Sequence, residues 1–189
     1  MKNIHFITID GCNDMLFNYP YIDSNSRYLQ GKTICAFDNN QIIKESWFTE
    51  LGGVIYINPL NDETSFADVG IITPVMPSED SEKGYYEIID YYVEKLQLLI
   101  HKQKGSGGYN HILVILPSHS DEFSTSLRRM AYYAIYGLIK GLGETNAQYG
   151  VFINGIILGE DNNQDLLKQW TTFLCSDNAN NIIGQIIKL

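Results

Sequence analysis

The chain has 189 residues, of which 44% are hydrophobic, and its 13 basic and 22 acidic side chains give a formal net charge of −9. A surface with this excess of acidic groups repels phosphate backbones and anionic lipids, which argues against nucleic acid and membrane partners. The length and apolar content suit one domain, covering residues 1–189, with enough chain to bury a full core.

Strand-like and helix-like patterns alternate along the chain. Apolar runs predict strands at residues 4–10, 32–37, 54–60, 67–75, 111–117, 151–159 and 181–189. Apolar residues at helical spacing predict helices at residues 39–53, 85–103, 128–148 and 165–176. Strands that alternate with helices indicate a parallel sheet covered on both faces. We therefore predict an α/β fold: a Rossmann-like, doubly wound parallel sheet in a three-layer α/β/α arrangement, forming a single domain.

The cysteines and the start of the chain suggest a cytoplasmic protein. Cys12, Cys35 and Cys175 are scattered and odd in number, which favours buried, reduced thiols over disulfides or a metal site. The opening MKNIHFITIDG has one lysine and strand-like alternation instead of the apolar core of a signal peptide. The four histidines show no metal-ligand spacing, so no metal is expected.

Several short motifs in the C-terminal part of the chain resemble the short-chain dehydrogenases/reductases, in particular the 3-oxoacyl-carrier-protein reductases. In that family a YxxxK-x4-GL-x3-L helix precedes YGI-x-VN-x-I-x-PG, and FL-x-SD and TGQ follow later. The matching residues here are Gly137-Leu138, Leu142, Tyr149-Gly150, Asn154-Gly155-Ile156, Gly159, residues 173–177 (FLCSD) and Gly184-Gln185. The first 110 residues resemble the family only in the order of their elements.

Aligning these motifs without a gap puts Arg128 at the position of the family's catalytic tyrosine and Tyr132 at that of its lysine. In the family the phenol hands a proton to the carbonyl oxygen while hydride arrives, and the lysine lowers the phenol's pKa and holds the ribose. Arginine stays protonated near neutral pH and cannot be that acid, and a tyrosine at the lysine position carries no positive charge. The resemblance therefore implies a site that has lost its catalytic residues.

A second reading keeps an active site. Tyr136 and Lys140 form a literal YxxxK on one helix face, and Ser118 follows the strand at 111–117, where the family has its catalytic serine. This pair stands eight residues beyond the aligned positions, about 12 Å along a helix, and it breaks the register of the later motifs. Ser118, Tyr136 and Lys140 are the candidate catalytic residues if the chain is an enzyme.

The expected cofactor loop is also degenerate. After the strand at 4–10 the family would have three spaced glycines, TG-x3-G-x-G, but here Gly11 is followed by Met15 and Phe17 at the other two positions. Those glycines let the backbone approach the pyrophosphate of the cofactor. The family's catalytic asparagine would fall near residues 90–92, which hold none. No cofactor is expected, with NADP or NAD as the cofactor if the active-enzyme reading holds.

Tyrosines concentrate in the helices at 85–103 and 128–148. In the family these two helices pair with a second subunit, and tyrosine is favoured at interfaces. Candidate interface residues are Tyr85, Tyr91, Tyr92, Tyr132, Tyr133 and Tyr136. Two hypotheses follow. The first is a non-catalytic subunit that pairs with an active, homologous ketoreductase acting on acyl chains held by a carrier protein, or that forms a homodimer. The second is an active NAD(P)-dependent oxidoreductase with a rearranged site. A third option is a self-associating scaffold or regulator with no enzymatic partner.

Overall fold

A computed structural model describes residues 28–59, 67–76, 79, 81–104, 107–118, 126–160 and 163–189. Its strands are β1 (Thr33–Phe37), β2 (Val54–Ile57), β3 (Val69–Ile72), β4 (Asn110–Leu116), β5 (Val151–Ile157) and β6 (Ile186–Lys188). Its helices are α1 (Ser46–Thr49), α2 (Glu82–Gln103), α3 (Ser126–Ala147) and α4 (Gln164–Leu174), followed by a 3₁₀ turn, η2 (Asp177–Ala179). The strand predicted at 4–10 and the residues Gly11, Cys12, Met15 and Phe17 lie outside the described residues.

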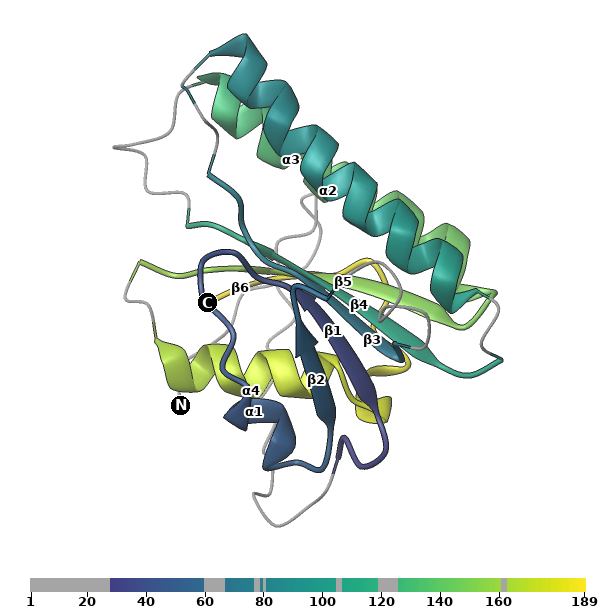
Figure 1. Cartoon of the computed structure of the whole chain (residues 1–189). Helices are drawn as coiled ribbons and strands as arrows, with labels where there is room; N and C mark the ends of the chain where they lie inside the picture. The colour runs from purple at the N-terminus through teal and green to yellow at the C-terminus, as the bar shows by residue number, and fades with distance from the viewer. Residues whose placement is uncertain are drawn as a thin grey trace.

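The six strands of the described residues form one parallel sheet in the order β2-β1-β3-β4-β5-β6. Helices α2 and α3 cover one face of the sheet, and α1 and α4 cover the other (Figure 1). Each pair of helices closes its own apolar core against the sheet, one containing Trp47 and Trp170 and the other Tyr92 and Ile135. The predicted three-layer, doubly wound α/β fold is confirmed.

Helix α2 forms where the sequence pattern places it. The Ser81 hydroxyl accepts a hydrogen bond from the Gly84 N–H at 3.3 Å, which caps the first turn. Ile88, Leu96 and Leu99 are buried on one face, as the helical spacing predicts. Among the described residues no helix is both long enough and apolar enough to cross a membrane.

Helix α3 runs into β5 through a tight turn. Gly150 has a φ of +74°, and a Cβ there would lie 2.7 Å from the Gly108 carbonyl oxygen, so the turn requires glycine. On the strand that follows, the Asn154 amide donates to the Ile182 carbonyl at 2.8 Å and accepts from the Gln185 N–H at 3.0 Å. This amide fixes the segment that leads into β6.

The predicted helix at 39–53 is much shorter in the structure, where α1 covers only four residues. Ile43, Trp47 and Leu51 are buried as their spacing predicts, but Ile43 belongs to a loop. The loop forms because the carboxylate of Asp38 accepts hydrogen bonds from the N–H groups at positions 40, 42 and 43, which a helix would use differently.

Candidate functional site

The strand order reverses between β1 and β3, which pair directly with each other. In open α/β sheets, ligands bind outside the carboxyl ends of the strands at such a switch point. The loop at this position is therefore residues 38–43, with the sequence DNNQII and no glycine. Sequence reasoning assigned the phosphate loop to Gly11, Met15 and Phe17, but the described sheet puts a different loop at the switch point.

The carboxylate of Asp38 fills the centre of this loop. One of its oxygens accepts hydrogen bonds from the N–H groups of Asn40, at 3.3 Å, and Ile42, at 3.1 Å, and from the Thr73 hydroxyl, at 3.0 Å. The other oxygen accepts from the Ile43 N–H at 2.7 Å. The Asp38 side chain is 3% exposed, and these bonds satisfy a buried anion.

Side chains from three strand ends close the switch point around Asp38. The Asp38 N–H donates to the side-chain oxygen of Asn58 at 2.8 Å, and the Asn58 amide donates back to the Asp38 carbonyl at 2.9 Å. From the loop, the Asn40 amide donates to the Pro74 carbonyl at 2.6 Å. The ends of β1, β2 and β3 are thus tied together by the chain's own polar groups.

Helix α2 places two phenols against the strands. The Tyr91 hydroxyl donates to the Phe37 carbonyl at 3.4 Å, and the Tyr92 hydroxyl donates to the Ile115 carbonyl at 3.1 Å. Burial, with the nearby Asp38 carboxylate adding to it, raises the pKa of Tyr91 to about 12. These phenols stand in the segment where the resemblance implies a catalytic asparagine, and both are held protonated at neutral pH.

The positions aligned with the catalytic tyrosine and lysine lie near the start of α3. Tyr132 is 3% exposed and packs in the core between α2, α3 and the sheet. Burial raises the pKa of its phenol, and the Arg128 guanidinium one turn away opposes that shift. A core tyrosine at this position cannot hold a ribose.

The active-enzyme reading needs Ser118, Tyr136 and Lys140 together, and the structure separates them. The Lys140 backbone packs against Gly184, whose N–H donates to the Ile153 carbonyl of β5. Ile112 of β4 pairs with Ile153 of β5, so Ser118 lies six residues beyond the level of Ile153 along the strands. This separation corresponds to about 20 Å of strand. Tyr136 is itself buried, so the three residues do not converge on one site.

The candidate interface tyrosines divide into three groups. Tyr92, Tyr132 and Tyr136 are core residues, which corrects the prediction that they lie at an interface. Tyr85 and Tyr91 are half-buried, and Tyr133 is 65% exposed. Tyr92 already lies on the apolar stripe of its helix, and this periodicity identifies it as a core residue. Tyr86 and Met130, which were not among the candidate interface residues, are also exposed and lie on the same two helices.

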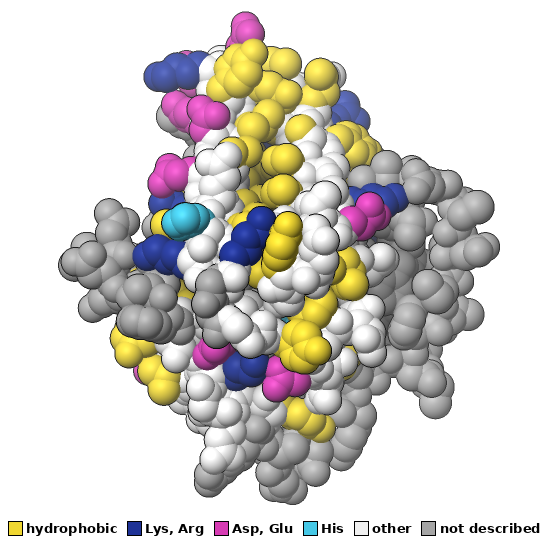
Figure 2. Space-filling model, turned by 90° about the vertical axis from the view of Figure 1, so that its right-hand side faces the viewer, with side chains coloured by type: hydrophobic (Ala, Val, Ile, Leu, Met, Phe, Trp, Pro, Cys, Tyr) yellow, Lys and Arg dark blue, Asp and Glu magenta, His cyan; other side chains and the backbone are white. Residues whose placement is uncertain are grey.

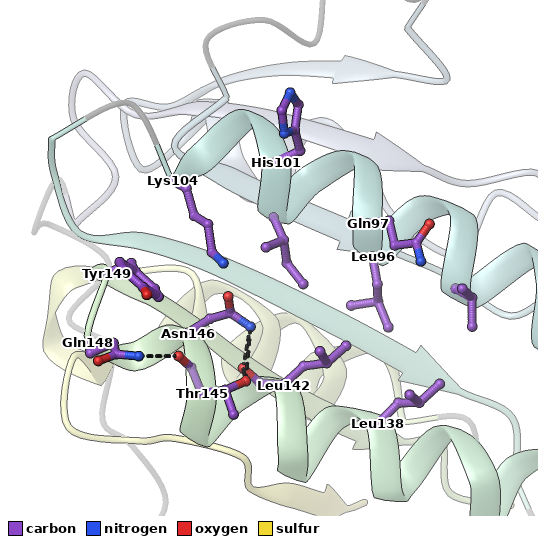
Figure 3. Close-up of a pocket in the computed structure, with 12 residues that line it drawn as sticks. Leu96, Gln97, His101, Lys104, Leu138, Leu142, Thr145, Asn146, Gln148 and Tyr149 are labelled. Carbon is purple, nitrogen blue, oxygen red and sulfur yellow. Dashed lines mark hydrogen bonds between the residues drawn. The ribbon is translucent and has the colours of Figure 1, made fainter.

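A hollow of about 590 Å³ lies between the C-terminal halves of α2 and α3 (Figure 3). Leu96, Leu138 and Leu142 form part of its apolar wall. At one end the Lys104 ammonium lies 4.6 Å from the centre of the Tyr149 ring, a cation–π contact. The hollow belongs to the outer helix face and not to the switch point.

Sequence reasoning missed Asp38, Asn58 and Thr73. Asp38 directly follows an apolar strand and precedes two asparagines, a pattern typical of a side chain that binds nearby backbone N–H groups. From the sequence alone, this pattern predicts a turn. Asn58 and Thr73 could not be assigned without the strand order, because each comes from a different strand end.

The fold is that of the short-chain dehydrogenases/reductases. The short-chain dehydrogenase of Leptospira borgpetersenii with bound NAD+ matches with a TM-score of 0.69 and 15% identity, over 91% of this chain and 96% of that chain. The enoyl-[acyl-carrier-protein] reductase (NADH) of Aquifex aeolicus matches with a TM-score of 0.67 and 16% identity, over 85% and 95%. A Serratia marcescens short-chain dehydrogenase/reductase matches with a TM-score of 0.65 and 12% identity, over 86% and 97%. By sequence, no family model and no curated protein matches the chain.

Proposed function

We propose that this chain is a catalytically degenerate reductase-like protein that acts as a non-catalytic subunit of an active ketoreductase. The observation that carries the proposal is Tyr132, a buried core residue at the position where the resemblance puts the lysine. Arg128, one turn before it, takes the position of the acid and stays protonated near neutral pH. The side chains needed to deliver a proton and to hold a nicotinamide ribose are both replaced.

The outer face of α2 and α3 supports the pairing part of the proposal. Tyr133 is 65% exposed, Met130 56% and Tyr86 53%, and hydrophobic side chains form a band along this side of the molecule (Figure 2). Tyrosine and methionine are enriched at protein interfaces. Gly137 and Gly141 lie on the same side of α3 as Tyr133, and a Cβ at either would meet nothing within 4 Å. Such small residues allow the backbone of a partner helix to approach closely.

The partner that fits best is a homologous active subunit with an equivalent pair of helices. The enoyl-[acyl-carrier-protein] reductase among the structural neighbours supports a carrier-protein-linked acyl substrate for the complex. We place the complex in the cytoplasm, with buried thiols at Cys35 and Cys175 in keeping with a reducing compartment. A homodimer through the same face is the competing assembly.

Pairing can be tested with two tyrosines of similar exposure. The tagged chain is expressed in its native host and purified, and the reductase that co-purifies is then expressed with it for quantitative reconstitution. Tyr133→Asp on α3 should abolish this association, because it buries a carboxylate in an apolar contact. Tyr109 directly precedes β4 and is 59% exposed, and Tyr109→Asp should leave the association intact. Equal effects of the two substitutions, or association with no reductase, would contradict the proposal.

The alternative function, an NAD(P)-dependent oxidoreductase built on Ser118, Tyr136 and Lys140, is not favoured. Structural neighbours have NAD+ or NADP bound, which is the observation on its side. Against it, Tyr136 is buried, and the Lys140 backbone packs against Gly184, toward the opposite end of the strands from Ser118.

A further inference from the structure

We propose that the Asp38 carboxylate is a built-in anion, which occupies the place that a ligand's phosphate would take at the switch point. The chain's own carboxylate therefore accepts the hydrogen bonds of this anion-binding loop, and the phosphate of a nucleotide does not bind there. This inference concerns a single loop of the isolated chain and does not rest on the proposed pairing with a reductase.

The donors around Asp38 are those that a phosphate loop offers. Backbone N–H groups of residues 40, 42 and 43 and the Thr73 hydroxyl converge on its two oxygens at distances from 2.7 to 3.3 Å. Successive N–H groups in a turn that includes a left-handed residue form a concave anion site. Gln41, with a φ of +55°, is that residue here.

The hydrogen bonds of the loop are already directed at the Asp38 carboxylate. The Asp38 side chain is 3% exposed, and the bonds from Asn40 to Pro74 and between Asp38 and Asn58 join the loop to the neighbouring strand ends. A phosphate at this point would have to displace the carboxylate or stand in contact with it, and like charges at short distance in a buried site repel strongly.

Anion rescue of a variant tests the inference. Asp38→Ala removes the carboxylate and leaves its donors without an acceptor, so its Tm should fall by about 5 °C or more. Inorganic phosphate or pyrophosphate should then raise the Tm of this variant by about 3 °C at ten times its Kd, measured against chloride at equal ionic strength. The wild-type chain should show no such phosphate-specific shift.

Asp68→Ala is the matched control. Among the described residues, the Asp68 carboxylate accepts a single hydrogen bond, from the Thr33 N–H at 2.8 Å, at the other end of β1. Its variant should lose stability without phosphate rescue. If Asp38→Ala does not fold, Asp38→Asn, which keeps one acceptor oxygen, should fold with a lowered Tm.

The inference is overturned if either Asp38 variant has the same Tm as the wild-type chain. It is also overturned if phosphate or pyrophosphate shifts the Tm of Asp38→Ala no more than that of Asp68→Ala or the wild type. None of these outcomes bears on pairing with a reductase, which is measured separately with the Tyr133 and Tyr109 variants.

Discussion

Alanine should stabilise the chain at two glycines of α3, Gly137 and Gly141, and destabilise it at a third, Gly143. A Cβ at Gly137 or Gly141 would meet nothing within 4 Å. A Cβ at Gly143 would lie 2.9 Å from the Gly184 Cα and N and 3.0 Å from the Ile153 carbonyl oxygen. All three of these neighbours are backbone atoms, which cannot move aside as the end of a flexible side chain can.

The magnitudes follow from these distances. Alanine in place of glycine in an exposed helix interior adds about 0.5–1 kcal/mol of stability, so Gly137→Ala and Gly141→Ala should each raise the Tm by about 1–4 °C. Gly143→Ala gains the same helix propensity but must push α3 away from the sheet, and overpacking costs about 1–3 kcal/mol. The result should be a net loss of about 1–2 kcal/mol and a Tm lowered by roughly 2–8 °C.

Urea and thermal unfolding of the isolated chain measure the stabilities, and titration with the partner reductase measures pairing. The Gly137→Ala, Gly141→Ala double variant should be a more stable monomer that pairs more weakly, because its methyl groups keep the partner helix away. Opposite signs for stability and pairing cannot come from general unfolding. A Gly143→Ala chain as stable as the Gly137→Ala chain would refute the close approach of α3 to β5 and β6. Unchanged pairing of the double variant would refute this face as the contact.

Three further predictions concern the core and the lost site. Burial lowers the pKa of His111 to about 4 from 6.5, so the folded chain favours the neutral imidazole. The free energy of unfolding, measured in urea, should therefore be highest above pH 6.5 and fall by about 3 kcal/mol as the pH falls toward 4. His111→Leu should make this pH dependence weaker. Arg128→Tyr combined with Tyr132→Lys should show no NADPH-dependent turnover, because the second change puts a lysine in the core; turnover would count against the degenerate-site account. Burial raises the pKa of Cys35 to about 12 and that of the Cys175 thiol as well, so peptide mapping after iodoacetamide should find both unmodified in the native chain and labelled in denaturant.

The sequence predicts most of the described fold because its signals are local. Buried parallel strands such as β4 and β5 are continuous apolar runs, and α2 and α4 carry clear apolar stripes. Their periods and lengths need no tertiary information. The turn at Tyr149-Gly150 is also local, since its φ of +74° lies in the region that favours glycine.

The site depends on contacts between distant residues, and the sequence could not supply them. Asp38 reads as a turn residue, but its role depends on Thr73, which is 35 residues away, and on Asn58, which is 20 residues away. The hydrogen bonds to Asp38 also explain the outcome at residues 39–53. The apolar spacing there predicts correctly which residues are buried, but the predicted helix is wrong for most of the segment. The interface prediction failed for Tyr132 and Tyr136 because a count of tyrosines does not separate the inward face of α3 from its outward face.

The most direct test of the central claim is a calorimetric titration of the purified wild-type chain with NADPH and with NADH, run beside an active short-chain reductase as a positive control. With the switch point closed around Asp38 and Tyr132 in the core, we expect no saturable heat up to millimolar cofactor. A dissociation constant in the micromolar range would show that a cofactor pocket survives, and it would contradict the account of this chain as a degenerate, non-catalytic subunit.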